Sequence, residues 1–419
     1  MHVSRGLDTP ARRALALTAA GLTLLCVNPE PTQGPNHVNL LLSAAMCLSP
    51  LVLLMRGARV LIPRVDIPLG LVCLLVTAGP LLFHPETVRW RTMLFTCAYC
   101  VFFMALARTL RVSRLTPEFL CRLTRVIVYA FAILLIVQQL CLVTGLPVPM
   151  GTHDYDGIAP WKLNTLMTEP SHTVVALSTI MFFYTRTRRI EAPDETLWLC
   201  VCRRPWLWAA YVWTIFSTVN ASSFVIGPLC LLPYVTRRNA LPVAGAVAAA
   251  LALLYLTPAG GLPQVSRVRD FSLAFLSGSP ERMWEADPSA ATRVVPTLEG
   301  ARLVDPADPA MYVGHGVDAD IRDTPPRMPW KNDNGSAGVL GMWHNYGALC
   351  ALAFWAAIAV VTVTPRDWLS WVAFLYAIQM SADYNMQLVW IIMAWSMAFK
   401  YSVAGRHRML AAFPTAKTS

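Results

Sequence analysis

Basic residues gather in the one long polar interval of this chain, which runs from about Thr257 to Gly347. A guanidinium group is permanently charged and grips phosphate through parallel hydrogen bonds, each worth about 1.5–3 kcal/mol when sheltered from water. The interval therefore has the residues that a pyrophosphate site would use, although a solvated basic surface against anionic lipid headgroups has the same composition. Its basic residues are Arg267, Arg269, Arg282, Arg293, Arg302, Arg322, Arg327 and Lys331.

Two short segments place ionisable groups where a polar stretch enters an apolar one: Glu169-Pro170-Ser171-His172 and His344-Asn345. A carboxylate or imidazole at such a depth can act as a general base. The local alternative for the first segment is a helix start, because Pro fits the first turn and Glu favours the positive end of the dipole. We expect Glu169 and His344 to be catalytic, and His172, Asn345 and His315, which lies between two glycines, to bind substrate.

Motifs for metals and nucleotides are weak or missing. Asp154-Tyr155-Asp156 and Asp318-Ala319-Asp320 spell D-x-D, a pattern that can hold a divalent cation against a diphosphate, but the match is too short to predict a metal. The sequence has no P-loop, no G-x-S-x-G and no H-E-x-x-H. The pair Cys97 and Cys100 lies in an apolar run, where cysteine is a packing residue. We therefore expect no metal and no cofactor.

The composition indicates an integral membrane protein. Hydrophobic residues make up 56% of the chain and charged residues only 14%, whereas soluble domains carry about 25% charged residues. The formal net charge of +10 fits the Lys and Arg that membrane proteins collect in cytoplasmic loops. A nucleic-acid partner is excluded because no basic stretch is interleaved with stacking aromatic residues outside an apolar segment.

Apolar segments long enough to cross a bilayer must position these residues. On the rule that a span needs about 20 apolar residues, we expect an all-α polytopic membrane protein with about 12 transmembrane helices and one large outer loop. Three of the spans are short, and Gly227-Pro228 and Pro233 interrupt one of them. The expected spans are 12–27, 38–55, 66–83, 90–107, 126–146, 172–185, 206–220, 223–236, 240–257, 341–363, 368–381 and 386–402.

The side of each loop follows from its charge. If the amino terminus is cytoplasmic, most of the 34 Lys and Arg fall on the cytoplasmic side, and every short loop agrees in sign. Both termini are then cytoplasmic. The outer side receives the loop 147–171, with Lys162, and the long polar interval. The expected segments are 1–257 with nine spans, the outer loop 258–340, and 341–419 with three spans and a cytoplasmic tail.

Four stretches resemble the bacterial superfamily of O-antigen polymerases and O-antigen ligases, which includes the Wzy-type polymerases. Leu166–His172 looks like the family's Glu-Pro-Ser segment at the start of a span. Ser217–Gly227 is similar to its Ser-rich link between two spans. Ala290–Arg293, followed by Tyr312–Gly316, resembles the arginine and the later Gly-x-Gly of the large periplasmic loop. Trp343–Leu349 looks like its His-Asn segment.

The resemblance implies a GT-C-like membrane glycosyltransferase in the bacterial inner membrane. Such an enzyme transfers glycan from an undecaprenyl-pyrophosphate carrier to an acceptor repeat unit at the periplasmic face, for exopolysaccharide or O-antigen, without metal or nucleotide. The family pattern assigns Arg293 first and Arg302 second to the donor pyrophosphate; Lys162 stands where the family often has another arginine. A chain-length regulator and a flippase are further implied partners.

Other functions remain open from the sequence. An O-antigen ligase shares the same motifs, although the Glu-Pro-Ser stretch favours a polymerase. A secondary transporter for an anionic solute shares the span number and the outer arginines, but it needs ionisable residues within spans, and these are scarce. A membrane O-acyltransferase would need a histidine deep in a span, and none is placed so.

Overall fold

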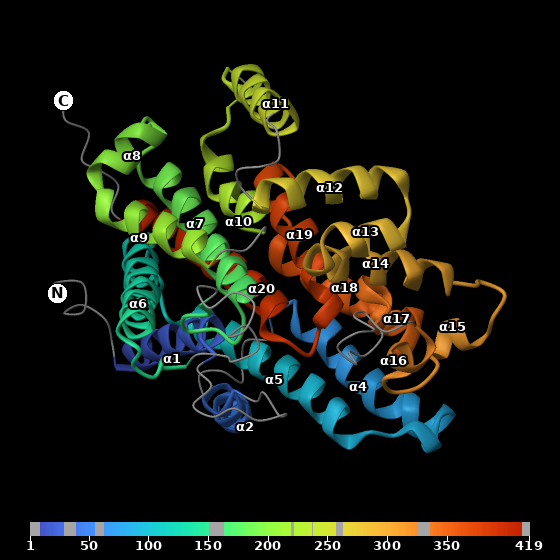
Figure 1. The fold of residues 1–419 in the computed structure, drawn as a ribbon. Helices are drawn as coiled ribbons and strands as arrows, with labels where there is room; N and C mark the ends of the chain where they lie inside the picture. Colours follow the sequence, from blue (N-terminus) through green and yellow to red (C-terminus); the bar gives the residue numbers. More distant parts are fainter. Residues whose placement is uncertain are drawn as a thin grey trace. The chain divides into compact units, whose positions relative to one another are not determined.

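The computed structural model describes residues 9–28, 39–54, 63–150, 163–218, 222–236, 238–256, 263–324 and 336–412 (Figure 1). Within these ranges every regular element is a helix, and no strand occurs. The expected all-α class is therefore confirmed. Contacts within the chain define two compact units, the first with residues 1–63, 101–234 and 390–419 and the second with residues 64–100 and 235–389. These units are defined by packing and differ from the expected segments 1–257, 258–340 and 341–419, which were defined by their expected side of a membrane.

Three helices are long and apolar enough to cross a membrane: α4 (Asp66–Phe83), α5 (Trp90–Val112) and α6 (Pro117–Thr144). The longest, α6, is well terminated, because Thr116 accepts a hydrogen bond from the Phe119 N–H and Gly145 ends it in the left-handed conformation. Shorter apolar helices are α2 (Leu40–Leu54), α18 (Ala348–Thr362) and α19 (Trp368–Met380). These helices support a membrane protein, while the twelve spans stay a prediction.

The other expected spans also contain helices. They are α1 (Thr9–Cys26), α7 (Pro170–Glu191), α9 (Pro205–Ser217), α11 (Ala240–Leu256) and α20 (Gln387–Ala412). The predicted interruption near Gly227 is present, because α10 (Ser222–Ile226) ends there and a 3₁₀ helix, η4 (Gly227–Tyr234), follows. The expected span 341–363 is divided at Gly347 into a short helix, α17 (Gly341–Tyr346), and α18.

In the first unit, α7 is the central helix. It packs against η4, α6 and α9, and its residues from Pro170 to Thr187 are buried apart from His172. The buried Arg186 lies over the ring of Phe399 at 4.2 Å, a cation–π contact that lets a charge stay inside. The short helix α8 (Leu197–Arg203) follows α7, where Glu195 binds both Arg188 and Arg203.

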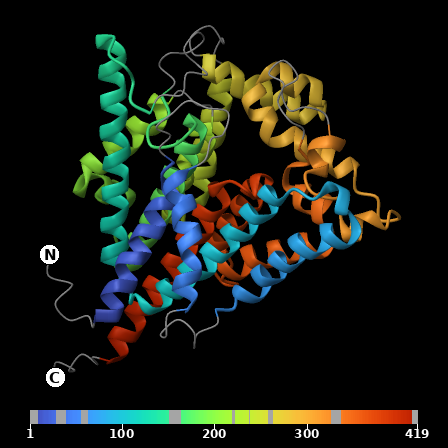
Figure 2. The ribbon, with the colours of Figure 1, turned by 90° about the horizontal axis from the view of Figure 1, so that it is seen from below.

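In the second unit, the long polar interval is mostly helical in its described parts. Three of its helices begin with proline, which is pre-organised for a first helical turn: α12 (Pro263–Ser277), α13 (Pro280–Ala286) and α14 (Pro288–Arg302). They lie side by side in Figures 1 and 2 and share a small core of Ala274, Met283, Ala291 and Val295. The interval is thus a small helical domain with its own core.

Shorter elements join this helical domain to the apolar helices of the second unit. They are α15 (Ala310–Val313), α16 (Ala319–Asp323), η6 (Gly338–Leu340), η7 (Ser381–Asp383) and, between α4 and α5, η2 (Pro85–Thr87). Helix α14 packs closely on η6, since a Cβ atom at Gly300 would collide with the Ala337 carbonyl oxygen. Helix α18 packs along α4. The short helix α17 contacts α4, α18 and η6, and α16 packs on α17.

Candidate functional site

The turn Gly314–Gly316 is fixed by the connection between α4 and α5. The carbonyl oxygen of Gly314 lies 2.7 Å from His84 Nε2, so that this nitrogen donates to it. Thr87 Oγ1 accepts from the Val317 N–H at 3.3 Å. Gly314 has φ +91°, and a Cβ atom there would collide with the Asn345 backbone, so the position needs glycine. The turn places His315 directly against α17.

The rings of His315 and His344 are stacked. Their centroids are 4.3 Å apart and their planes differ by 16°. The His315 N–H also donates to the His344 carbonyl oxygen at 2.9 Å. Two residues 29 positions apart in the chain therefore form one stacked pair. Two cations at this separation repel each other, so the stack favours at most one protonated ring.

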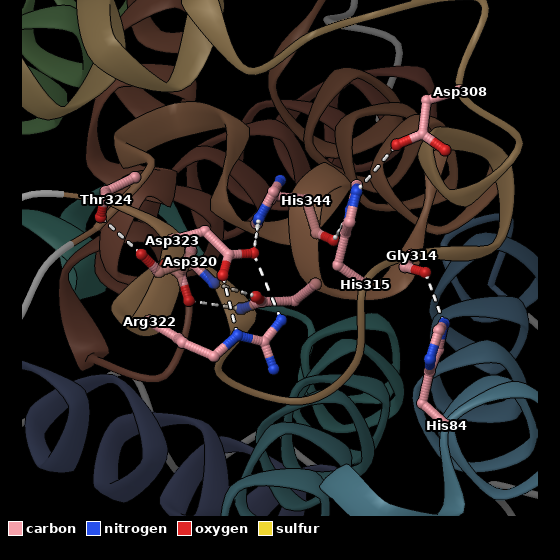
Figure 3. Close-up of polar contacts among 10 residues, drawn as sticks. His84, Asp308, Gly314, His315, Asp320, Arg322, Asp323, Thr324 and His344 are labelled. Atoms are coloured by element: carbon pink, nitrogen blue, oxygen red, sulfur yellow. Dashed lines mark hydrogen bonds and ion pairs between the residues drawn. The ribbon is translucent and has the colours of Figure 1, made fainter.

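His344 has the surroundings of a neutral base. Its Nε2 lies 2.8 Å from Asp323 Oδ2, and its Nδ1 is buried without a hydrogen-bond partner among the described residues (Figure 3). Burial lowers the pKa of His344. The hydrogen bond to Asp323 raises this pKa in part, and the neighbouring His315 lowers it further. The hydrogen-bond pattern assigns the proton to Nε2, because Asp323 is an acceptor. Nδ1 then carries the lone pair.

Asp323 is held as a carboxylate. Burial opposes ionisation, but hydrogen bonds from Arg322 and His344 outweigh it and lower the pKa of Asp323. Arg322 Nε donates to Asp323 Oδ1 at 2.8 Å. An ionised carboxylate behind an imidazole fixes the tautomer and stabilises the imidazolium that forms when the ring accepts a proton.

His315 has the opposite surroundings. Its Nδ1 lies 3.3 Å from the His344 carbonyl oxygen and its Nε2 lies 3.1 Å from Asp308 Oδ2, so both ring nitrogens face acceptors (Figure 3). A hydrogen bond from the Ala310 N–H, followed by those from His315, lowers the pKa of Asp308. The two stacked rings therefore differ in their surroundings. Both ring nitrogens of His315 lie near an acceptor, whereas His344 has one nitrogen on Asp323 and the other without a partner among the described residues.

Asn345 lies next to His344 on α17 and has protein partners for its side-chain amide. Its Nδ2 donates to Asp320 Oδ1 at 2.8 Å and to the Tyr384 hydroxyl at 3.1 Å, and its Oδ1 accepts from the Asp320 N–H at 2.8 Å. All three residues are buried. Substrate binding by Asn345 stays a prediction, but in this structure its amide serves to join α16 to α17.

The predicted arginines lie on α14 in the same unit. Arg293 is half-buried near the middle of the helix, and its carbonyl oxygen accepts from Gln379 Nε2 at 2.9 Å. Arg302 is exposed in the last turn. Helix α14 contacts η6, which leads directly into α17. The backbone of α14 at Arg293 is therefore hydrogen-bonded to α19, and α14 is connected to the histidine pair through η6.

Glu169 and His172 belong to the first unit, at the start of α7. Glu169 precedes the helix and accepts from Ser171 Oγ at 3.1 Å, and its Oε2 lies 3.9 Å from His172 Nε2. His172 Nδ1 lies 3.1 Å from Thr168 Oγ1. The expected helix start is confirmed. Lys162 and the motif Asp154–Asp156 lie outside the described residues.

Sequence reasoning missed Asp308 and Asp323, the carboxylate partners of the two histidines. Asp308 carried no signal, whereas the i+3 spacing of Asp320 and Asp323 could have indicated that both lie on one helix face. The two aspartates of the second D-x-D motif, Asp318 and Asp320, bind different side chains. Arg89 Nη1 and Thr92 Oγ1 donate to Asp318 Oδ2, whereas Asp320 binds Asn345. Among the described residues no group of three or more His, Cys, Asp or Glu is arranged to hold a metal ion.

Comparison of the chain with family models, with curated proteins and with solved structures gives no match.

Proposed function

We propose that this chain is a membrane glycosyltransferase, a polysaccharide polymerase for exopolysaccharide or O-antigen at the periplasmic face of the bacterial inner membrane. Its donor is an undecaprenyl-pyrophosphate-linked oligosaccharide and its acceptor is another repeat unit. The observation that carries the proposal is the His344–Asp323 pair, 2.8 Å apart, at a short helix that directly precedes the apolar helix α18. A base at this place is suited to a hydroxyl acceptor tethered to a lipid.

The reaction needs a base and a site for a leaving pyrophosphate. The acceptor hydroxyl oxygen attacks the anomeric carbon of the donor, the bond from that carbon to the pyrophosphate oxygen breaks, and the hydroxyl proton passes to His344 Nδ1. Asp323 stabilises the resulting imidazolium. Because Nδ1 is buried, the hydroxyl reaches it only when neighbouring side chains move. A well-placed base contributes about 10²–10⁴ in rate.

The leaving pyrophosphate takes up the electron pair of the broken bond, and fixed cations near it lower the barrier. Arg293 is the first candidate for this role and Arg302 the second. The half-buried position of Arg293, on a helix whose backbone is hydrogen-bonded to Gln379 of α19, supports the order, since a partly buried side chain loses less conformational entropy on binding than an exposed one.

The proposal is tested with the purified full-length chain in liposomes that contain a lipid-pyrophosphate-linked repeat unit. The wild type should give a ladder of products. Arg293→Ala should abolish polymer while the protein stays in the membrane, because the pyrophosphate loses its main cation. Arg269→Ala is the matched control, since Arg269 donates to its own neighbour Asp270 at 3.0 Å, and it should keep the ladder.

The products also separate the alternatives. Transfer of one preformed chain to a different acceptor, without a ladder, would assign the chain to the ligases. Unchanged donor lipid together with uptake of an anionic solute by the same liposomes would assign it to the transporters. Full-length polymer from Arg293→Ala would contradict the role of that residue.

A further inference from the structure

Helix α16 carries Asp323 to His344, yet it has only five residues. A helix of this length has almost no stability of its own, because the cost of the first turn is not recovered by later hydrogen bonds. Its N-cap residue, Asp318, has φ +56° and makes no capping hydrogen bond with its side chain. The position of Asp323 must therefore come from contacts between α16 and its neighbours.

At its start α16 is held by Asp318, which accepts from Arg89 and Thr92. Its buried contact with α17 is a closed pair of hydrogen bonds between Asp320 and Asn345. The Asp320 N–H donates to Asn345 Oδ1 and Asn345 Nδ2 donates to Asp320 Oδ1, both at 2.8 Å. The Tyr384 hydroxyl accepts a second hydrogen bond from Nδ2 and connects the pair to the segment after η7. The three side chains are at most 8% exposed. Buried polar groups that are hydrogen-bonded to each other hold one arrangement, because any other leaves them unpaired.

The spacing relates this pair to the histidine. Asp320 and Asp323 are three residues apart on α16 and share one face, while Asn345 and His344 are neighbours on α17. The two contacts, Asp320 with Asn345 and Asp323 with His344, thus join the same two helices side by side. A shift of α16 that breaks the first contact also moves the second.

We infer that Asp320 and Asn345 are positioning residues: their paired hydrogen bonds seat α16 on α17 and thereby hold Asp323 against Nε2 of His344. The seating of α16 on α17 is a property of the fold. Its effect on the rate of glycan transfer rests on the proposed function. Neither residue needs to touch the substrate.

An exchange of the two side chains tests the pair. Asn345→Asp places two carboxylates face to face in a buried site, so that like charges push α16 away. Asp320→Asn leaves two amides, which can still bond, and should have a small effect. The double variant Asp320→Asn with Asn345→Asp restores one donor and one acceptor in reversed positions, and the Tyr384 hydroxyl can then donate to the new carboxylate. Asn239→Asp, at the start of α11, makes the same chemical change elsewhere in the second unit and is the control.

The readout is the reactivity of His344 in the full-length protein in liposomes. Diethyl pyrocarbonate acylates neutral imidazole, and mass spectrometry of the peptide that contains residue 344 gives the rate at that ring. Asn345→Asp should raise this rate on the order of tenfold, because release of α16 opens the ring to the reagent. The double variant should return it to within about threefold of the wild type, and the control should not change it.

Activity provides the second measurement. In the transfer assay Asn345→Asp should lower kcat on the order of tenfold with little change in KM, as expected when a residue acts on the base and not on binding. The double variant should recover most of that loss. A merely structural role would lower the amount of folded protein without this rescue of kcat.

The outcomes are distinct for the two proposals. If Asn345→Asp leaves the reactivity of His344 unchanged, or if the double variant is folded and fails to restore it, the positioning role is wrong. If the reactivity follows the expected order while the wild type transfers no glycan, the positioning role stands and the proposed function fails.

Discussion

Glu169 and His172 at the start of α7 can be compared with Asp323 and His344 beside α17, because each is a carboxylate–imidazole pair. The first pair is 3.9 Å apart, with the imidazole side chain 15% and the carboxylate side chain 52% exposed. The second is 2.8 Å apart, with the imidazole side chain 6% and the carboxylate side chain 28% exposed. The first is formed within one turn of chain, whereas the second joins residues 21 positions apart. Only the second has the short contact and the buried ring that direct a proton to one nitrogen.

The largest expected effect is at His344. His344→Gln should reduce glycan transfer by about 10²–10⁴, the usual contribution of a general base. His172→Gln, the matched change in the other pair, should reduce it less than tenfold, because His172 Nδ1 already lies 3.1 Å from Thr168 Oγ1 and the Glu169 carboxylate is too far from Nε2, at 3.9 Å, to direct a proton. The measurement is the initial rate of product formation in liposomes at equal protein content. Equal losses in the two variants would remove the distinction between the pairs.

The two pairs also differ in how much of each could be predicted from the sequence. The helical class, the apolar segments and the helix start at Pro170 follow from composition and local patterns, so all of them were predictable. His344 and His315 were recognisable as candidates from their neighbours in the chain. Their carboxylate partners were not, because Asp323 and Asp308 meet the histidines only after the polar interval has folded into short helices. Asp323 and His344 are 21 positions apart and Asp308 and His315 are seven apart, and neither spacing is a helical or strand spacing that would predict the contact.

The long polar interval shows the same limit. Its place outside the membrane stays a prediction, and the sequence patterns assign it no secondary structure. In the folded chain Pro263, Pro280 and Pro288 begin helices, and apolar residues spread between them form a core. What these residues contact depends on neighbours from other helices, and this is why the sequence offered candidate residues in this region but not the geometry that joins them.

The second prediction concerns Asp323 and the pH dependence of transfer. In the wild type the rate should fall as the pH drops through the pKa of His344, which burial places below its usual value near 6.5. Asp323→Asn removes the carboxylate that raises this pKa, so the acid limb should move to lower pH. The maximal rate should also fall, by about 10², because an amide can stabilise the wrong tautomer and cannot stabilise the imidazolium. A rate–pH profile of both proteins checks the two effects.

The direction in which the acid limb moves shows whether Asp323 acts on the pKa of His344 or only stabilises the fold. A loss of folded protein lowers the whole profile without displacing it. An acid limb that moves to higher pH in Asp323→Asn would contradict the assignment, since it would mean that the carboxylate lowers the pKa of the base. Glu169→Gln is the matched change in the other pair and should leave the limb where it is.

The smallest expected effect is that of Glu169→Gln on stability. Glu169 precedes α7 without a side-chain capping hydrogen bond, and its exposed carboxylate faces the positive end of the helix dipole. Such a contact is worth about 0.3–1 kcal/mol, and salt screens it. Thermal unfolding of the detergent-solubilised protein should therefore show a small loss in low salt that shrinks as salt is added. The sequence also predicts a catalytic Glu169, but its exposure and its 3.9 Å distance from His172 favour His344 as the base. If His344 is the base, transfer by Glu169→Gln should stay within about threefold of the wild type. A loss of transfer as large as that of His344→Gln, with stability unchanged, would instead make Glu169 the base and reverse the roles of the two pairs.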